Sequence, residues 1–191
     1  YTTHPSSAHW FVNDVENPYS EVQRFDWMRG YHVGGRSLLW GRQSYRFSPL
    51  DFEANARDGV AVDWPIRYRD LEPWYAHVER FIGVSGQTEN LPHLPDSVFQ
   101  PPMQMHVVEK AVKQRIEASY PERRMTIGRT ANLTEPLGDR AACHYCGICQ
   151  RGCSPGAYFS SLSSTLPAAN KTGRLTLRAN SVVEGLDYDP A

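Results

Sequence analysis

The sequence predicts a fold of the α/β class. Amphipathic helix patterns occupy residues 70–83 and about 105–119, and apolar residues alternate with polar ones over 174–183, as they do in strands. The 191 residues are 40% apolar and 21% charged, a balance typical of globular proteins and not of disordered or collagen-like chains. Fourteen glycines and fourteen prolines predict many turns and long connections between these elements.

The first fifty residues are rich in aromatic side chains that show no sustained helical spacing, so we expect loops and short extended pieces there. No internal repeat occurs in this segment or elsewhere in the chain. The aromatic positions are Trp10, Phe11, Tyr19, Phe25, Trp27, Tyr31, Trp40, Tyr45 and Phe47.

The clearest helix pattern covers residues 70–83. Asp70 is a suitable N-cap and Gly83 a suitable end, and Pro73 is tolerated if it lies in the first turn. Five apolar residues between them recur at helical spacing: Leu71, Trp74, Tyr75, Val78 and Ile82.

The second helix pattern, about 105–119, lies between Pro101-Pro102 and Pro121 and places Val108, Val112, Arg115 and Ser119 on one line. The intervening residues, 84–104, are rich in proline and aperiodic, so we expect a long surface excursion. A short helix is predicted near Pro167-Ala168-Ala169, and a strand over 174–183.

The charge balance excludes broad electrostatic attraction to nucleic acid or to an anionic membrane. Lysine and arginine total 20 against 21 acidic residues, a net charge of −1. The longest apolar run is far shorter than the roughly 20 residues that cross a bilayer, so we expect no membrane-spanning segment. One stretch is locally basic, with a charge of +4 over 24–46, which favours an anion there. Its interleaved arginine and aromatic side chains are also compatible with single-stranded nucleic acid, but the overall acidity and the lack of a repeat of this pattern rank that partner lower. The arginines of the stretch are Arg24, Arg29, Arg36, Arg42 and Arg46.

Paired glycines lie at the centre of this basic stretch. Gly34 and Gly35 allow the backbone to approach a ligand closely and to present amide donors to it. The surrounding segment, residues 29–41, is called the Gly-Gly loop below. A tight turn flanked by solvated arginines is an equally simple interpretation, because no Gly-x-Gly-x-x-Gly phosphate fingerprint occurs in the sequence.

The four cysteines form a C-x2-C-x2-C-x3-C run between residues 143 and 153, called the cysteine loop below. The spacing is that of bacterial ferredoxin loops, but Ser154 precedes Pro155 and a second cysteine group is absent. Local disulfides or reduced packing thiols are favoured over an iron–sulfur cluster, and zinc ranks last. An electron-transfer module built on this loop is the alternative function. The cysteines are Cys143, Cys146, Cys149 and Cys153.

No set of residues in the sequence matches a hydrolase or a histidine metal motif. The seven histidines form no His-x3-His or His-Glu-x2-His pattern, and no serine lies in a Gly-x-Ser-x-Gly elbow. His32 is separated from the glycine pair by one residue, and we expect a structural hydrogen-bonding role for it. No catalytic residue and no metal ligand is therefore assigned.

Several blocks together resemble the glucose-methanol-choline (GMC) flavoprotein oxidoreductase family. They are Arg29 to Gly41, Asp63-Trp64-Pro65-Ile66 with Asp70 to Tyr75, Cys146 to Cys153 with Gly156-Ala157, and Thr165 to Ala169 with the predicted strand. The resemblance implies that residues 1–191 are an internal part of a Rossmann-type FAD-binding domain of the α/β class. That domain would carry inserted helices and long loops and be incomplete at both ends, in agreement with a chain that starts at Tyr1 and stops at Ala191.

The resemblance also implies the cofactor and its contacts. FAD contacts are expected at Gly34, Gly35, Arg36, Ser37, Leu38, Trp40 and Gly41, and the strand around Ser181 to Val183 is similar to one that meets the adenine. Some relatives attach flavin to a histidine at the position of Leu39, so the FAD here is expected to be non-covalent.

The implied reaction is the oxidation of an alcohol or sugar by hydride transfer to the flavin. The family's catalytic base is a histidine near the carboxy terminus, beyond Ala191, so none of the seven histidines is assigned to it. The electron acceptor, whether oxygen, quinone or cytochrome, is not indicated. Some sugar dehydrogenases of the family hold a three-iron cluster in a comparable region, but only Cys149 and Cys153 share that spacing, so structural thiols stay favoured.

Overall fold

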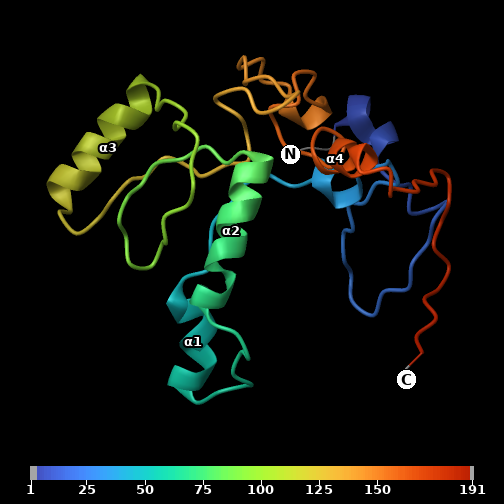
Figure 1. Cartoon of the computed structure of the whole chain (residues 1–191), viewed down its shortest axis with the longest axis horizontal. Coiled ribbons are helices and arrows are strands. Elements are labelled where there is room, and N and C mark those ends of the chain that lie inside the picture. Colours follow the sequence, from blue (N-terminus) through green and yellow to red (C-terminus); the bar gives the residue numbers. More distant parts are fainter. Residues whose placement is uncertain (1–3, 190–191) are drawn as a thin grey trace.

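The computed structural model describes residues 4–189, so Tyr1 and Ala191 lie outside the described residues. The described part contains the α-helices α1 (Pro49–Asp58), α2 (Tyr68–Ile82), α3 (Val107–Ser119) and α4 (Thr165–Lys171), joined by long loops (Figure 1). Short 3-10 helices cover Pro5–Trp10, Gly35–Leu38 and Cys149–Arg151. None of these helices combines the length and apolar content needed to span a bilayer.

The prediction of a strand over 174–183 is wrong. Residues 4–189 contain no strand, only isolated bridges, and the segment after α4 is extended and exposed, with Leu177 at 55% and Val183 at 76%. An extended segment becomes a strand only when a neighbour receives its backbone hydrogen bonds. No other described segment does so here, and the Rossmann-type α/β prediction is therefore not confirmed.

Helix α2 confirms the helix predicted over 70–83, with a shifted start. It begins after Arg67, whose backbone N–H donates to the Asp70 carboxylate at 2.8 Å, so Asp70 is the third helical residue and not the N-cap. Pro73 consequently lies in the second turn, not the first as expected. Gly83 ends the helix with φ of +76°, as predicted.

Helices α3 and α4 fall where the sequence predicts them, whereas α1 is an element that the sequence pattern did not suggest. Its start nevertheless carries a recognisable motif. Ser48 is the N-cap, Pro49 occupies the first helical position, and Asp51 accepts the Ser48 backbone N–H at 2.6 Å.

The core is a small ladder of three segments far apart in the sequence. Residues 129–133 are hydrogen-bonded to both 42–44 and 157–159: the Ala131 N–H donates to the Arg42 carbonyl at 2.8 Å, and the Phe159 N–H donates to the Ala131 carbonyl at 3.0 Å. Ile82, Val84 and Ala131 form the buried centre, with Trp40, Phe99 and Phe159 packed against it.

The segment 84–104 is only partly the surface excursion that was expected. Val84 and Ser85 are 1% exposed, and Ser85 bridges both Gln100 and Thr130. The proline-rich residues between these anchored ends form the loop on the outside. Its base thus belongs to the core.

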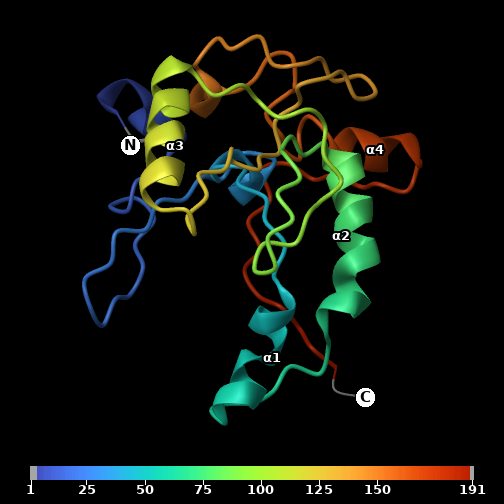
Figure 2. The same ribbon diagram turned by 90° about the vertical axis from the view of Figure 1, so that its left-hand side faces the viewer.

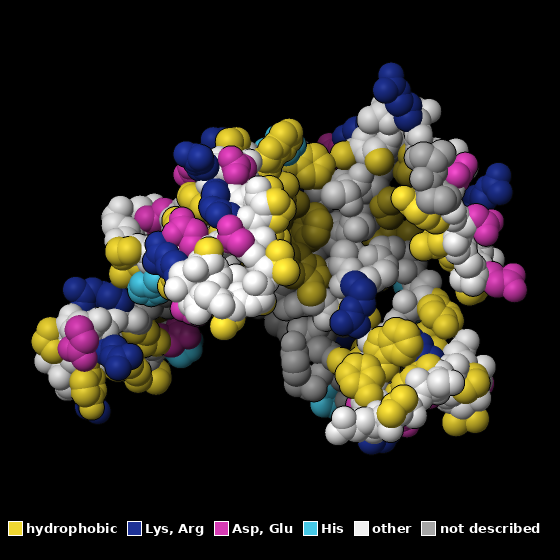
Figure 3. All heavy atoms as spheres, turned by 90° about the horizontal axis from the view of Figure 1, so that it is seen from below, with side chains coloured by type: hydrophobic (Ala, Val, Ile, Leu, Met, Phe, Trp, Pro, Cys, Tyr) yellow, Lys and Arg dark blue, Asp and Glu magenta, His cyan; other side chains and the backbone are white. Residues whose placement is uncertain are grey.

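Helices α1 and α2 form an arm that leads away from the ladder, with α1 at its outer end (Figures 1 and 2). Hydrophobic side chains gather on the face of the molecule shown in Figure 3. On α2 itself, Trp74 is 67% and Val78 is 48% exposed. Of the apolar stripe that predicted the helix, Ile82 is buried and Leu71 and Tyr75 are half-buried, so the stripe is only partly covered.

Candidate flavin-binding site

The paired glycines of the Gly-Gly loop adopt a backbone that side chains disfavour. Gly34 has φ of +105° and Gly35 has φ of +50°, both in the left-handed region. A Cβ added at Gly34 would meet Leu38 at 3.2 Å and Leu162 at 3.4 Å. A tight turn therefore exists here, and glycine is required at its first position for both conformation and space.

Ser37 fixes the loop to a segment over a hundred residues away. Its hydroxyl donates to the Gly34 carbonyl at 2.6 Å and accepts the Ser161 backbone N–H at 2.9 Å. The loop is thus held from both sides, internally and by the serine-rich turn that follows the cysteine loop.

Trp40 carries a buried polar atom that the protein leaves unpaired. Its ring packs edge-on against Phe159, with centroids 6.0 Å apart, but its Nε1 donor has no hydrogen-bond partner among the described residues. A buried N–H without an acceptor is unfavourable. An isoalloxazine ring has carbonyl and ring-nitrogen acceptors, so the loop fits the flavin that the resemblance implies.

The remaining predicted contacts have different surroundings. Gly41 has no atom within 4 Å of its added Cβ, which leaves open space beside the backbone. Leu38 is half-buried, and Arg36 is exposed and donates to the Met28 carbonyl at 2.7 Å. Val183 belongs to the unpaired segment after α4, and no described hydrogen bond connects it to the loop.

The basic stretch over 24–46 is not a single anion-binding surface. Arg24 pairs with Glu21, Arg29 with Asp14 at 2.8 Å, and Arg46 with Glu79 at 2.6 Å. The Arg29 guanidinium also lies over the rings of Tyr19 and Trp27. Within the described residues only Arg36 and Arg42 of this stretch lack a carboxylate partner.

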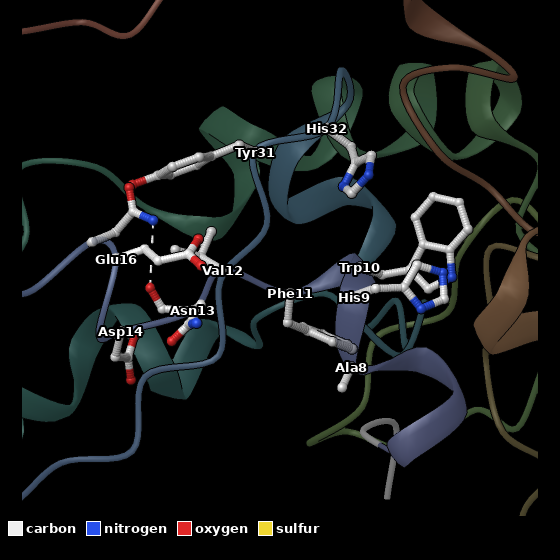
Figure 4. A pocket seen from close by; sticks show the side chains of 11 residues that line it. Ala8, His9, Trp10, Phe11, Val12, Asn13, Asp14, Glu16, Tyr31 and His32 are labelled. Atoms are coloured by element: carbon white, nitrogen blue, oxygen red, sulfur yellow. Dashed lines mark hydrogen bonds between the residues drawn. The ribbon is translucent and has the colours of Figure 1, made fainter.

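Two cavities border the Gly-Gly loop. The larger, of about 800 Å³, has a mixed polar and aromatic lining (Figure 4). It reaches the loop at His32, whose ring packs 5.1 Å from Trp10 and whose carbonyl accepts the Gly35 N–H at 2.9 Å. The smaller, of about 490 Å³, is lined partly by Arg29, Gly35 and Arg36. Both offer room for a ligand next to the loop.

All four thiols of the cysteine loop are free, so the local disulfide that the sequence allowed is not formed. The Cys153 sulfur accepts the Tyr158 backbone N–H at 3.3 Å, and burial raises the pKa of Cys149 above that of an ordinary thiol. Within residues 4–189, no three histidine, cysteine or acidic side chains are placed to hold a metal ion. Cys143, Cys149 and Cys153 are half-buried, whereas Cys146 is exposed.

Sequence reasoning missed the residues that anchor the loop from afar, in the turn around Phe159 and Ser161. Arg42 Nε donates to the Phe159 carbonyl at 2.7 Å across 117 residues of sequence. The basic stretch pointed to Arg42, but no local pattern could have indicated its partner.

Comparisons with known proteins give partial matches. No family model matches the chain. It is 28% identical over 163 residues to 6'''-hydroxyparomomycin C oxidase of Streptomyces lividus, which covers 77% of this chain and 29% of that protein. It is 32% identical over 114 residues to oxygen-dependent choline dehydrogenase of Xanthomonas euvesicatoria pv. vesicatoria (strain 85-10), a match that covers 59% of this chain and 20% of that protein.

A third relative is the fructose dehydrogenase large subunit of Gluconobacter japonicus, 39% identical over 54 residues, which cover 28% of this chain and 10% of that protein. The chain thus spans less than a third of the length of these curated relatives.

Proposed function

Because the curated homologues of this chain are GMC-type oxidoreductases, we propose that it is the flavin-contacting part of an FAD-dependent enzyme that oxidises CH–OH groups. The relatives' names specify hydroxyparomomycin C, choline and fructose. Since these differ from one another, the substrate is proposed only as an alcohol or a sugar.

The observation that carries the proposal is the unpaired Nε1 donor of Trp40 in the Gly-Gly loop. A flavin acceptor would remove the unfavourable free energy of this buried group, which is about 1–3 kcal/mol for an unsatisfied donor. The left-handed glycines beside it support the same interpretation, because they let the backbone come close to a planar ligand.

The residues of this chain would bind and orient FAD and would not take part in proton transfer. Trp40 would donate to the ring, Gly35 and Gly41 would keep side chains out of its way, and Ser37 would hold the loop in shape. When bound, FAD accepts the hydride that leaves the substrate carbon.

The cavity of about 800 Å³ next to His32 suits a hydroxylated substrate. Its lining combines the aromatic faces of Trp10 and Tyr31, 53% and 63% exposed, with the carboxylates of Asp14 and Glu16 (Figure 4). Aromatic faces pack against the apolar side of a sugar, and carboxylates accept hydrogen bonds from its hydroxyls.

A visible absorption spectrum of the purified full-length protein tests the cofactor. We expect the two bands of an oxidised flavin, and we expect acid precipitation to release the chromophore into the supernatant, as Leu39 at the attachment position predicts. Anaerobic addition of alcohols and sugars should then bleach the spectrum. A colourless protein that takes up no added FAD would contradict the proposal.

A further inference from the structure

Arg42 combines two unfavourable features at one position. Its φ is +59°, in the left-handed region that favours glycine, and a non-glycine residue is kept there only when its surroundings hold it. Its side chain is also 3% exposed, although arginine is among the residues least often buried. The backbone conformation at this position favours glycine, so the interactions of the arginine side chain outweigh the backbone strain.

The guanidinium of Arg42 clamps the end of the Gly-Gly loop. It donates to the carbonyls of Leu38, at 3.4 Å, and Trp40, and on its other side to that of Phe159, at 2.7 Å. It lies 3.9 Å from the centre of the Tyr158 ring. The clamp fixes the backbone on either side of Leu39 and so orients the Trp40 ring.

The charge of Arg42 is not neutralised. No described carboxylate lies within ion-pair distance of it, whereas Arg46, four residues on, has Glu79 at 2.6 Å. Burial lowers the pKa of Arg42, yet a guanidinium stays protonated in proteins. A buried cation without a counter-ion is unfavourable, and its field is weakly screened. That field acts on whatever the loop binds.

We propose that Arg42 is a positioning residue for the cofactor loop and that its unneutralised charge raises the reduction potential of the flavin held there. The inference rests on the proposed function. Reduction brings electrons onto the flavin, so a fixed positive charge beside its binding loop stabilises the reduced form over the oxidised form.

Arg140 provides a matched control. It is 7% exposed, it donates only to backbone carbonyls, at Ile82, Gly156 and Ala157, and no described carboxylate pairs with it. None of its acceptors belongs to the Gly-Gly loop. Its guanidinium lies 5.9 Å from the centre of the Phe159 ring, which is its one contact with the residues that anchor the loop. Substitution of Arg140 therefore removes comparable buried hydrogen bonds and none of the bonds to the Gly-Gly loop.

The experiment uses the full-length protein with Arg42→Lys, Arg42→Gly and Arg140→Lys, and measures the FAD dissociation constant, the flavin midpoint potential and thermal unfolding. Glycine readily adopts the φ of +59°, so Arg42→Gly removes the hydrogen bonds and the charge of the guanidinium without adding backbone strain. We expect it to weaken FAD binding by about tenfold, because a loop without its hydrogen bonds to Arg42 must be ordered when FAD binds, and to lower the potential.

Arg42→Lys keeps the positive charge but loses the hydrogen-bonding geometry of the guanidinium. It should therefore weaken FAD binding while the flavin potential stays near that of the parent. Arg140→Lys should lower thermal stability and leave both flavin properties unchanged. Provided that the parent binds FAD, two results would overturn the inference. One is an Arg42→Gly variant whose potential and FAD affinity equal those of the parent, and the other is an Arg140→Lys variant that changes both properties as much as Arg42→Gly does. A parent that binds no FAD would overturn the proposed function itself.

Discussion

Arg46 and Glu79 form a bidentate ion pair inside the protein. Arg46 Nε donates to Glu79 Oε1 at 2.8 Å and Nη2 donates to Oε2 at 2.6 Å, with both residues less than 10% exposed. The Glu79 hydrogen bond holds the pKa of Arg46 above its ordinary value. Oε2 also accepts the Val98 backbone N–H at 2.9 Å, so the pair joins α2 to the start of the arm and to the loop 84–104.

Glu79→Gln should destabilise the protein strongly, because it leaves the buried Arg46 charge with no carboxylate nearer than the exposed Glu72, 3.9 Å away. The expected loss is about 3–5 kcal/mol of unfolding free energy, measured by urea denaturation of the full-length protein. Glu72→Gln is the control, since the Glu72 carboxylate lies 3.9 Å from Arg46 and is 56% exposed. It should change stability by at most about 1 kcal/mol, and equal losses in the two variants would contradict the expectation.

Trp40→Phe should keep the fold and weaken FAD binding. Phenylalanine preserves the packing on Phe159 and removes the unpaired Nε1 donor, so the apoprotein should unfold at the parental temperature or above it. FAD affinity, followed by flavin fluorescence, should fall about tenfold. Unchanged affinity would show that Trp40 makes no hydrogen bond to the flavin.

Gly34→Ala should destabilise the fold, whereas Gly41→Ala should not. At Gly34 a methyl group meets Leu38 at 3.2 Å in a left-handed backbone, so unfolding free energy should fall by more than about 1 kcal/mol. At Gly41 the methyl enters open space, so stability should stay the same while FAD binding weakens. Thermal unfolding of the apoprotein and FAD titration separate the two, and retained FAD binding in Gly41→Ala would argue against a flavin at that glycine.

The cysteines should differ in alkylation by iodoacetamide. Cys146 is exposed and should react first, whereas Cys149 should react slowly at pH 8, because burial raises its pKa and the thiolate is the reactive form. The Cys149 rate should keep rising at pH values above the ordinary thiol pKa. Mass spectrometry of quenched samples gives each rate, and faster labelling of Cys149 than of Cys146 would refute the ordering.

Raised pKa at Cys149 also sets a direction for stability. Above the ordinary thiol pKa the cysteine ionises first in the unfolded chain, which then binds fewer protons than the folded protein. Unfolding is therefore favoured as pH rises through this range. Denaturation midpoints measured between neutral and alkaline pH should fall less in Cys149→Ser than in the parent.

The sequence pattern predicted those elements whose formation depends on residues close together in the sequence. The apolar spacing over 70–83 became α2, and the glycine pair became a left-handed turn. The family resemblance is confirmed by the curated homologues. Helix α1 was overlooked although Ser48, Pro49 and Asp51 form a good N-terminal motif, because its body lacks an apolar stripe and buries only Phe52.

The failures concern partners that lie far away in the sequence. Alternation over 174–183 describes a segment able to pair, and whether it becomes a strand depends on a neighbour that the pattern does not contain. The same reason hid the hydrogen bonds of the loop to Phe159 and Ser161. Neutralisation of Arg29 by Asp14 likewise depended on a fold that composition does not reveal.

The contact between Arg42 and Phe159 has a consequence for biosynthesis. The two residues are 117 positions apart, so at translation rates of about 5–20 residues per second the segment around Arg42 leaves the ribosome on the order of ten seconds before its acceptor. During that delay the nascent Gly-Gly loop has no clamp. On the proposed function, we expect FAD to load only onto chains whose synthesis has passed Phe159, because a ribosome stalled before that codon holds a loop without its Arg42–Phe159 hydrogen bond.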